Sequence, residues 1–333
     1  MANSHYIGGK ARPGIQSRPL KEAGFSVYEA VIIGSEDWNG LEEEARDGLF
    51  PSSIDIKGRE SEERWRELES RFQLLLDLAD SGPLGFVYVG VDGFPENIDR
   101  LRHLDYQYKA IEALPATSPA ALEAKTSYPE DLIKHAQLSG SKILVDICHL
   151  FQSAVFLQSQ RKPLEVIVRP DGSYSTQIGP EAAEEYYRMF EVIAQSGYLA
   201  PFVHTNGHAF VADQNPPKEG EKDLRLYLPD GRLIRAFDEE ALAPADWGDQ
   251  GAYNRNSYAV PISIGGQRKV AQWFRSHIFV TDPQDEIYRS LDVERSIQQL
   301  VSAEVKCLIL ENGKESVENL KEDAQFFERF WNR

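Results

Sequence analysis

The chain has little cysteine and no long apolar run, and both shortages narrow the classes of protein it can belong to. Only Cys148 and Cys307 occur among its 333 residues, and they form no CxxC pair. A zinc ribbon and a disulfide framework are therefore excluded, and a reducing compartment, the cytoplasm, is expected. No apolar run approaches the ~20 residues that span a bilayer. The N-terminal "MANSHYIGGKARPG" also lacks the apolar segment of a secretory signal, so we expect no membrane partner.

Basic residues are outnumbered by acidic ones. Lys and Arg number 36 against 53 Asp and Glu, which gives a net charge of -17. Binding to nucleic acid depends on neutralising phosphates with positive charge, so we expect no nucleic-acid partner. Several catalytic signatures are also missing: the sequence contains no G-x-G-x-x-G or P-loop, no H-E-x-x-H and no G-x-S-x-G.

Short β-rich runs alternate with helical patterns along the chain. The runs are "GFSVYEAVII", "SIDIKG", "PLGFVYVGVD", "AALEAK", "KILVDICH", "YLAPFVHTNGH" and "VKCLILEN". "KILV" and "CLIL" are continuous apolar runs, as buried parallel strands require, whereas "ESEERWRELESRFQLLLDLAD", "GPEAAEEYYRMFEVIAQSG" and "SVENLKEDAQFFERFW" have helical spacing. This alternation predicts βαβ units and a parallel sheet. Roughly eight units predict an α/β fold of the TIM (β/α)8-barrel type, with residues 1–333 as a single domain. The alternative, an open doubly wound sheet, would need a glycine-rich phosphate loop.

Two segments interrupt this alternation of strands and helices. "LEVIVRPDGSYSTQI" and "DLRLYLPDGRLIRAF" each place Pro-Asp-Gly between β-rich flanks, which is typical of a β-hairpin. We interpret them as two insertions, at about residues 157–180 and 211–275, that follow barrel strands and emerge on the C-terminal face. There they would form a rim or lid, with Arg232 and Tyr174 as candidate substrate contacts. The alternative is that the hairpins only extend a surface or mediate dimerisation.

Carboxylates and imidazoles follow four of the apolar runs. They are Glu123 after "AAL", Asp146 after "KILV", His204 after "APFV" and Glu311 after "CLIL". In a barrel the C-terminal ends of all strands meet at one face, so these side chains would converge there. Each alone has an ordinary structural explanation, such as a salt bridge. Together they form a ligand set that predicts a divalent metal site.

At these residues the sequence resembles the xylose-isomerase-like TIM-barrel superfamily. Within it, "LVDICHLFQSAV" is similar to the LDxNNxxVSA segment of the multinuclear non-heme iron-dependent oxidative enzymes, the group with the methanobactin oxazolone-forming enzyme. "HTNGH" is similar to that group's HLAGH, and "LEAKTSYPEDL" to its LEN-led strand. The resemblance covers roughly residues 120–156, 204–208 and 305–312.

The resemblance implies a set of site residues and a cofactor. The implied metal ligands are Glu123, Asp146, His149, His204 and Glu311. Glu123, Glu311 and His149 are also the implied catalytic residues. Further residues that would bind metal or support a ligand are His208, His277 and Asp282. The implied metal is iron, with manganese or zinc as alternatives. Because "SIDIKG" and "GFVYVGVD" carry no histidine, one or two ions are expected and not three.

Three functions remain open at this point. The first is an iron-dependent oxidative enzyme that acts on a peptide or small metabolite, with a peptide-recognition protein as partner. The second is a divalent-metal sugar or hydroxy-ketone isomerase or epimerase, in which a proton moves next to a metal-polarised carbonyl. The third is a non-catalytic barrel with a residual metal site. The first two make the chain a metal-dependent oxidoreductase or isomerase.

Overall fold

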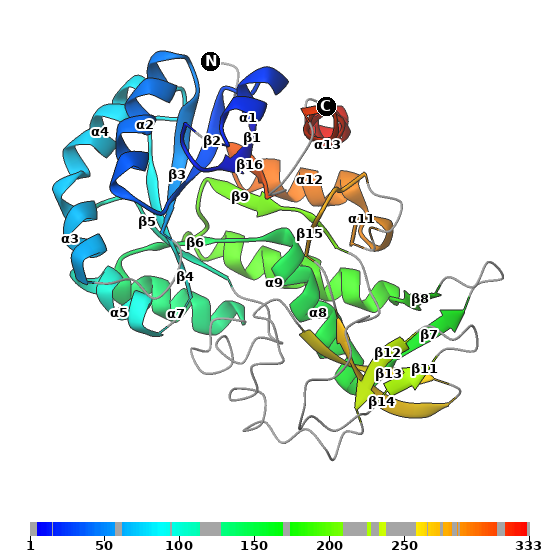
Figure 1. The fold of residues 1–333 in the computed structure, drawn as a ribbon. Coiled ribbons are helices and arrows are strands. Elements are labelled where there is room, and N and C mark those ends of the chain that lie inside the picture. The colour runs from blue at the N-terminus through cyan, green and yellow to red at the C-terminus, as the bar shows by residue number, and fades with distance from the viewer. Residues whose placement is uncertain are drawn as a thin grey trace.

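Eight parallel strands form a barrel in the computed structural model of the chain (Figure 1). The structure describes residues 5–14, 16–56, 62–93, 95–113, 128–168, 174–208, 225–227, 233–237, 258–264, 266–273, 276–281, 285, 287–311 and 317–331. The barrel strands are β1 (Tyr6–Ala11), β2 (Val27–Ile32), β3 (Phe50–Ile56), β4 (Tyr88–Asp92), β5 (Lys109–Glu112), β6 (Lys142–Leu144), β9 (Phe202–Thr205) and β16 (Cys307–Leu310). The predicted α/β barrel fold is confirmed.

The barrel closes between β6 and β9. The sheet runs in the order β6-β5-β4-β3-β2-β1-β16-β9, and two isolated parallel bridges, Ile143 to Leu199 and Asp146 to His204, join its two ends. The His204 amide donates to the Val145 carbonyl at 2.9 Å. Closure therefore brings the ends of β6 and β9, which are far apart in the sequence, directly next to each other.

Helices surround the barrel. They are α1 (Arg18–Ala23), α2 (Ser35–Arg46), α3 (Glu62–Ser70), α4 (Phe72–Ser81), α5 (Pro95–His103), α7 (Pro129–Ser139), α8 (Ile147–Arg161), α9 (Pro180–Gln195), α11 (Ile287–Ser290), α12 (Val293–Ser302) and α13 (Val317–Trp331). The pattern over residues 60–80 predicts one helix, but the structure has two. Arg71, with φ -106° and ψ 4°, leaves the helical region and separates α3 from α4. None of the described helices is long and apolar enough to cross a membrane.

The two insertions join into one sheet. β7 (Leu164–Val168) and β8 (Tyr174–Gln177) form the first predicted hairpin, and β11 (Arg225–Tyr227) and β12 (Leu233–Phe237) form the second. A third hairpin, β13 (Tyr258–Ile264) with β14 (Gln267–Trp273), was not predicted and links them in the order β11-β12-β14-β13-β7-β8. These strands fall inside the predicted insertions. The assignment of the whole chain to one domain stays a prediction.

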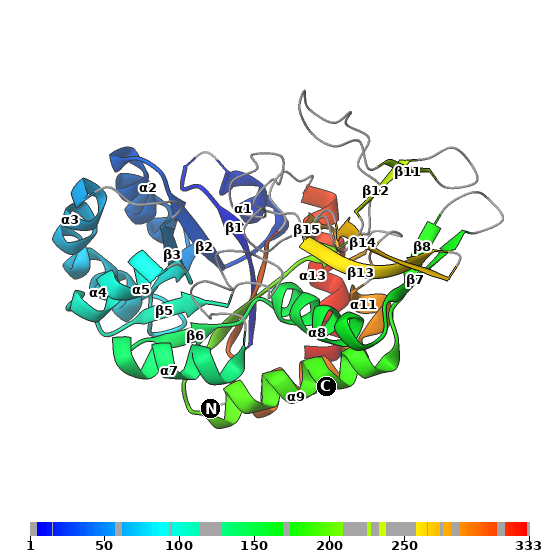
Figure 2. The ribbon, with the colours of Figure 1, turned by 90° about the horizontal axis from the view of Figure 1, so that it is seen from below.

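The inserted sheet lies beside the barrel, beyond α8 (Figures 1 and 2). Ile262 of β13 pairs with Leu164 of β7, and both side chains are buried in the same core as α8 and α9. Because α8 separates β6 from β7, the first hairpin does not leave its barrel strand directly. The predicted role of the hairpins as a lid stays a prediction.

Candidate metal centre

A layer of polar side chains lies directly above an apolar layer inside the barrel. Val27, Ala110, Leu144, Phe202 and Ile309 belong to the apolar layer, a buried cluster at the barrel's interior. Side chains of a strand point to the same face every second residue. Two residues after each of these apolar positions comes a buried carboxylate or imidazole: Glu29, Glu112, Asp146, His204 and Glu311. The polar layer therefore follows from strand geometry, at the C-terminal ends of the strands.

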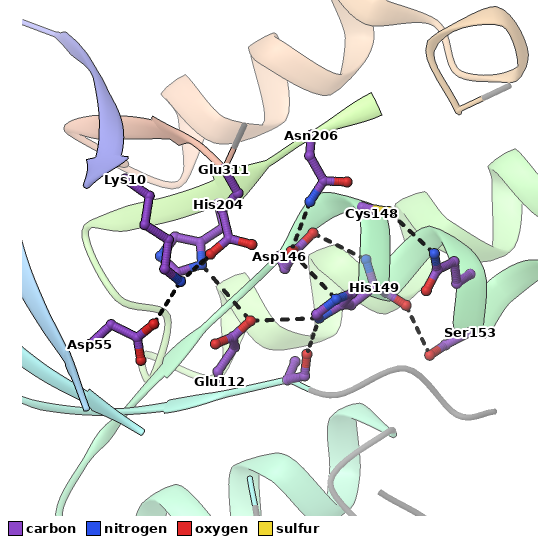
Figure 3. Close-up of polar contacts among 12 residues, drawn as sticks. Lys10, Asp55, Glu112, Asp146, Cys148, His149, Ser153, His204, Asn206 and Glu311 are labelled. Atoms are coloured by element: carbon purple, nitrogen blue, oxygen red, sulfur yellow. Dashed lines mark hydrogen bonds and ion pairs between the residues drawn. The ribbon is translucent and has the colours of Figure 1, made fainter. Parts of the chain in front are cut away.

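Four of these side chains converge on one point (Figure 3). Glu112, Asp146, His204 and Glu311 each place one ligand atom so that all four atoms lie within 4.8 Å of one another, and all four residues are buried. Glu112 and His204 lie in β5 and β9, and Glu311 and Asp146 lie one and two residues beyond the ends of β16 and β6. A spread of this size brackets a single ion whose ligands are each about 2.0–2.2 Å away. We call these residues the ligand quartet.

Asp146 is held in place by the start of α8. It is the N-cap residue of that helix, and its Oδ1 accepts a hydrogen bond from the His149 amide at 3.1 Å. Its Oδ2 accepts from Asn206 Nδ2 at 3.4 Å. The start of α8 and Asn206 therefore each hold one carboxylate oxygen of Asp146, which is a member of the ligand quartet.

His204 is oriented by Glu29. The ring Nε2 donates to Glu29 Oε2 at 2.7 Å, and Ser53 Oγ donates to the same oxygen at 2.6 Å. This leaves Nδ1 facing the quartet, 3.1 Å from Glu311 Oε1 and 3.9 Å from Glu112 Oε1. Histidines that bind metals commonly donate their second ring nitrogen to a carboxylate, which fixes the tautomer. His204 already has this arrangement.

The charges around His204 perturb its pKa and that of Glu112. Burial alone would lower the pKa of His204, but Glu29 and Glu311 hold it well above the ordinary value of 6.5. Burial alone would raise the pKa of Glu112, but the nearby positive charges of His204 and Lys10 lower it to about 2. Without a metal ion, the imidazolium of His204 is the cation that the quartet carboxylates surround.

Lys10 and His149 lie on opposite sides of the ligand quartet (Figure 3). Lys10 Nζ is 2.7 Å from Glu29 Oε1 and 2.8 Å from Asp55 Oδ2, and it also pairs with Glu311 Oε1. Burial alone would lower the pKa of Lys10, but Asp55 and Glu29 raise it well above its ordinary value. The ammonium is therefore a permanent charge of the site.

The donor set fits a divalent cation. Five carboxylates are buried here (Glu29, Asp55, Glu112, Asp146 and Glu311). Among the described residues, Lys10 and the His204 imidazolium are the cations that contact them, so negative charge is in excess. Nδ1 of His204 is buried without a hydrogen-bond partner in the described part of the chain. A cation bound by the quartet would use that nitrogen and offset the excess charge.

His149 stands beside the ligand quartet. Its Nδ1 donates to the Ala113 carbonyl at 3.2 Å. Its Nε2 lies 3.7 Å from Asp146 Oδ2, and its Nδ1 lies 3.6 Å from Glu112 Oε1. It was predicted as a ligand, but its ring nitrogens are not among the four converging ligand atoms. Its place suits a contact with a substrate oxygen.

Three of the residues predicted from the sequence lie together in the group that could hold a metal ion: Asp146, His204 and Glu311. Their role as ligands stays a prediction, as do the roles given to the other site residues. Glu123, Arg232 and Asp282 lie outside the described residues, and Tyr174 is part of β8. His208 in β10 (Gly207–His208) and His277 in β15 (Ser276–Ile278) lie on two strands that pair with each other.

The sequence analysis missed Lys10, Glu29, Asp55 and Glu112. Glu112 is the last residue of β5, the strand that pairs with β6 in the barrel. The sequence analysis placed Glu123 at the end of the barrel strand that precedes β6. Among the described residues, Glu112 is the carboxylate at that position. For Glu29 and Glu112 the signal is the alternation within the strand, in which a polar residue follows an inward apolar residue by two positions. Lys10 and Asp55 follow a glycine and a serine at that spacing and have no such signal.

Replacing Glu29 by glutamine is expected to weaken metal binding about 10–100-fold, because the neutral amide accepts more weakly from His204 Nε2 than the carboxylate does and fixes the tautomer less firmly. Glu44→Gln is a matched control: Glu44 is also buried, accepts from Ser17 Oγ at 2.6 Å and pairs with Lys21 Nζ at 2.8 Å, but it lies on α2. Isothermal titration with Mn²⁺ measures both affinities. Equal affinities in the two variants would contradict the role given to Glu29.

Metal binding is also expected to strengthen as the pH rises. The raised pKa of His204 keeps its proton in place near neutral pH, and a cation must displace that proton from Nδ1. Affinity should rise about tenfold per pH unit from roughly pH 6 to 8, with one proton released per ion. Glu112 does not contribute to the pH dependence of the metal affinity in this range, because its pKa is lowered to about 2. Calorimetry in buffers of different ionisation enthalpy measures the proton release, and an affinity independent of pH would contradict the assignment.

Comparisons with known proteins give similar solved structures but no matching family. No protein-family model matches the chain, and no curated protein matches it. A xylose isomerase-like TIM-barrel protein from Mycobacterium smegmatis, solved with magnesium, is similar in structure with a TM-score of 0.48 and 13% identity, over 98% of this chain and 96% of that chain. A sugar phosphate isomerase/epimerase from Parabacteroides distasonis has a TM-score of 0.38 and 10% identity, over 98% and 94% of the two chains. The activities named for those proteins are not transferred to this chain.

Proposed function

We propose that the protein is a divalent-metal-dependent enzyme that isomerises or epimerises a sugar or hydroxy-ketone. The observation that carries the proposal is the convergence of Glu112, Asp146, His204 and Glu311 within 4.8 Å. Three carboxylates and one imidazole suit a hard divalent ion such as magnesium or manganese. A non-heme iron oxygenase typically uses two histidines and one carboxylate. The donor set therefore favours the isomerase over the iron-dependent oxidative enzyme that the sequence resemblance implies.

A bound divalent cation would polarise the carbonyl of the substrate and make the neighbouring C–H bond more acidic. The chain would supply the groups that move the proton. Glu112 and Glu311 both lie close to His204 Nδ1, so each would have a carboxylate oxygen near the reacting carbon. A pair of carboxylates can remove a proton on one side and return it on the other.

His149 and Asp146 would bind and orient the substrate and the ion. The hydrogen bond from His149 Nδ1 to the Ala113 carbonyl fixes the ring, so that Nε2 is available for a substrate oxygen. Asp146 would hold the ion and keep its position through α8. Cys148 has no part in this scheme, because burial and Asp146 raise the pKa of its thiol well above the ordinary value.

The test combines metal analysis with an exchange assay. Protein purified without added metal is analysed for its elements, then loaded with Mn²⁺ and incubated with a panel of ketoses and aldoses in D₂O. We expect metal-dependent deuterium incorporation next to the carbonyl, abolished by EDTA. Bound iron with oxygen consumption and no exchange would favour the oxidative enzyme instead. No metal bound at stoichiometric level would favour the non-catalytic barrel.

A further inference from the structure

Lys10 has the surroundings of a bound cation. Its ammonium contacts carboxylates from three strands: Glu29 of β2, Asp55 of β3 and Glu311, which follows β16. The first two contacts are 2.7 and 2.8 Å long. An ammonium has three N–H donors, and here each donor has one carboxylate to meet. A hard divalent ion would take the same kind of oxygen ligands.

Glu311 connects this cation to the ligand quartet. Its Oε1 pairs with Lys10 Nζ and also lies 3.1 Å from His204 Nδ1, the atom that would bind the metal. Glu29 is shared in the same way, with Oε1 on Lys10 and Oε2 on the ring of His204. Shared carboxylates of this kind are typical of sites with two metal ions about 4 Å apart. Figure 3 shows Lys10 and Asp55 on one side of this group, with Asp146 and His149 on the other.

We propose that Lys10 is a tethered cation that occupies the position of a second metal ion, and that it thereby restricts the site to one divalent ion. Lys10 is thus a positioning residue. It offsets the negative charge of Glu29, Asp55 and Glu311 with a charge that cannot dissociate. A lysine also has no open coordination position, so substrate oxygens would bind only at the ion held by the quartet. The inference rests on the proposed function, because it assumes that the quartet binds metal.

The test is the number of Mn²⁺ ions bound per chain in Lys10→Met, which keeps the length of the side chain and removes its charge. We expect one ion in the parent and two in Lys10→Met, with the magnetic coupling of two nearby Mn²⁺ ions in the electron paramagnetic resonance spectrum. Lys10→Arg keeps the charge and should bind one ion. Lys10→Met/Asp55→Asn removes one carboxylate from the new position and should also return to one ion. Equilibrium dialysis with elemental analysis gives the counts.

The deciding quantity is the number of Mn²⁺ ions that Lys10→Met binds per chain compared with the number that the parent binds. A gain of one ion in Lys10→Met supports the proposal, and no gain overturns it. If Lys10→Met does not fold without metal, it is refolded from denaturant in Mn²⁺: recovery with two ions supports the proposal, and recovery with one overturns it. Failure to recover it with Mn²⁺, while Lys10→Met/Asp55→Asn folds, also overturns it. A parent that binds no metal counts against the proposed function, whereas the gain in the variant tests Lys10 by itself.

Discussion

Asp146→Asn is expected to weaken divalent-metal binding at least about 100-fold, because the loss of a direct ligand costs more than the loss of a group that only supports one. The amide cannot supply the negative charge that the carboxylate gives to the ion. Asparagine is as good an N-cap as aspartate, so α8 should keep its start and the protein its fold. Calorimetric titration with Mn²⁺ measures the affinity, and circular dichroism on melting measures the stability.

The chain offers a matched control for this variant. Asp292 caps α12 in the same way, accepting from the Arg295 amide at 3.0 Å, but it lies outside the ligand quartet. Asp292→Asn should bind Mn²⁺ as the parent does and change stability by a similarly small amount. If Asp146→Asn also binds Mn²⁺ like the parent, Asp146 is not a ligand.

Glu112→Gln should lose metal affinity by a similar factor of at least about 100. Any proton transfer found in the exchange assay should fall by a further 10²–10⁴-fold, on the order expected when an acid–base group is removed. The physical reason is the same in both measurements: Glu112 is buried, ionised and directed at the centre from the end of β5.

Glu123→Gln is the informative comparison, since the sequence analysis gave Glu123 the ligand role that we propose for Glu112. Glu112→Gln is expected to have the larger effect on Mn²⁺ affinity. A parent-like affinity in Glu112→Gln together with a lost affinity in Glu123→Gln would show that the sequence-based assignment was right and that Glu112 is not a ligand.

The barrel was predictable because most of its strands can be recognised from their own residues. "KILV" and "CLIL" are continuous apolar runs. Glu311 comes immediately after β16, and Asp146 comes two residues after the end of β6. The hairpins were predictable from Pro-Asp-Gly for a similar reason. Their union in one sheet was not, because pairing between distant strands leaves no local signal. The Gly265-Gly266 pair between β13 and β14 is a hairpin motif that the sequence analysis did not use.

The two missed barrel strands are short or rich in glycine. β5 contains only "KAIE", and β1 reads "YIGGKA", where two glycines weaken the β-strand pattern. The structure supplies the reason for one of them: a Cβ at Gly8 would lie 2.5 Å from the Val27 carbonyl oxygen of β2. This close approach of two strands is a property of the folded barrel. Lys10 and Glu112 were missed along with the strands that carry them.

Glu29 and Asp55 were missed for a different reason. Their strands, β2 and β3, were recognised as "GFSVYEAVII" and "SIDIKG", but both acids lie within the strand and not after it. A search restricted to residues that follow apolar runs passes over them. Their burial and their ion pairs with Lys10 become visible only when the barrel closes and the three strands lie side by side.

The central claim is that Glu112, Asp146, His204 and Glu311 bind one divalent ion, and crystals grown with Mn²⁺ test it most directly. The anomalous difference map should show one ion, with His204 Nδ1 and a carboxylate oxygen from each of the three acids about 2.0–2.4 Å away. At saturating Mn²⁺, the absence of an ion between these four side chains, or an ion bound elsewhere in the barrel, would contradict the account.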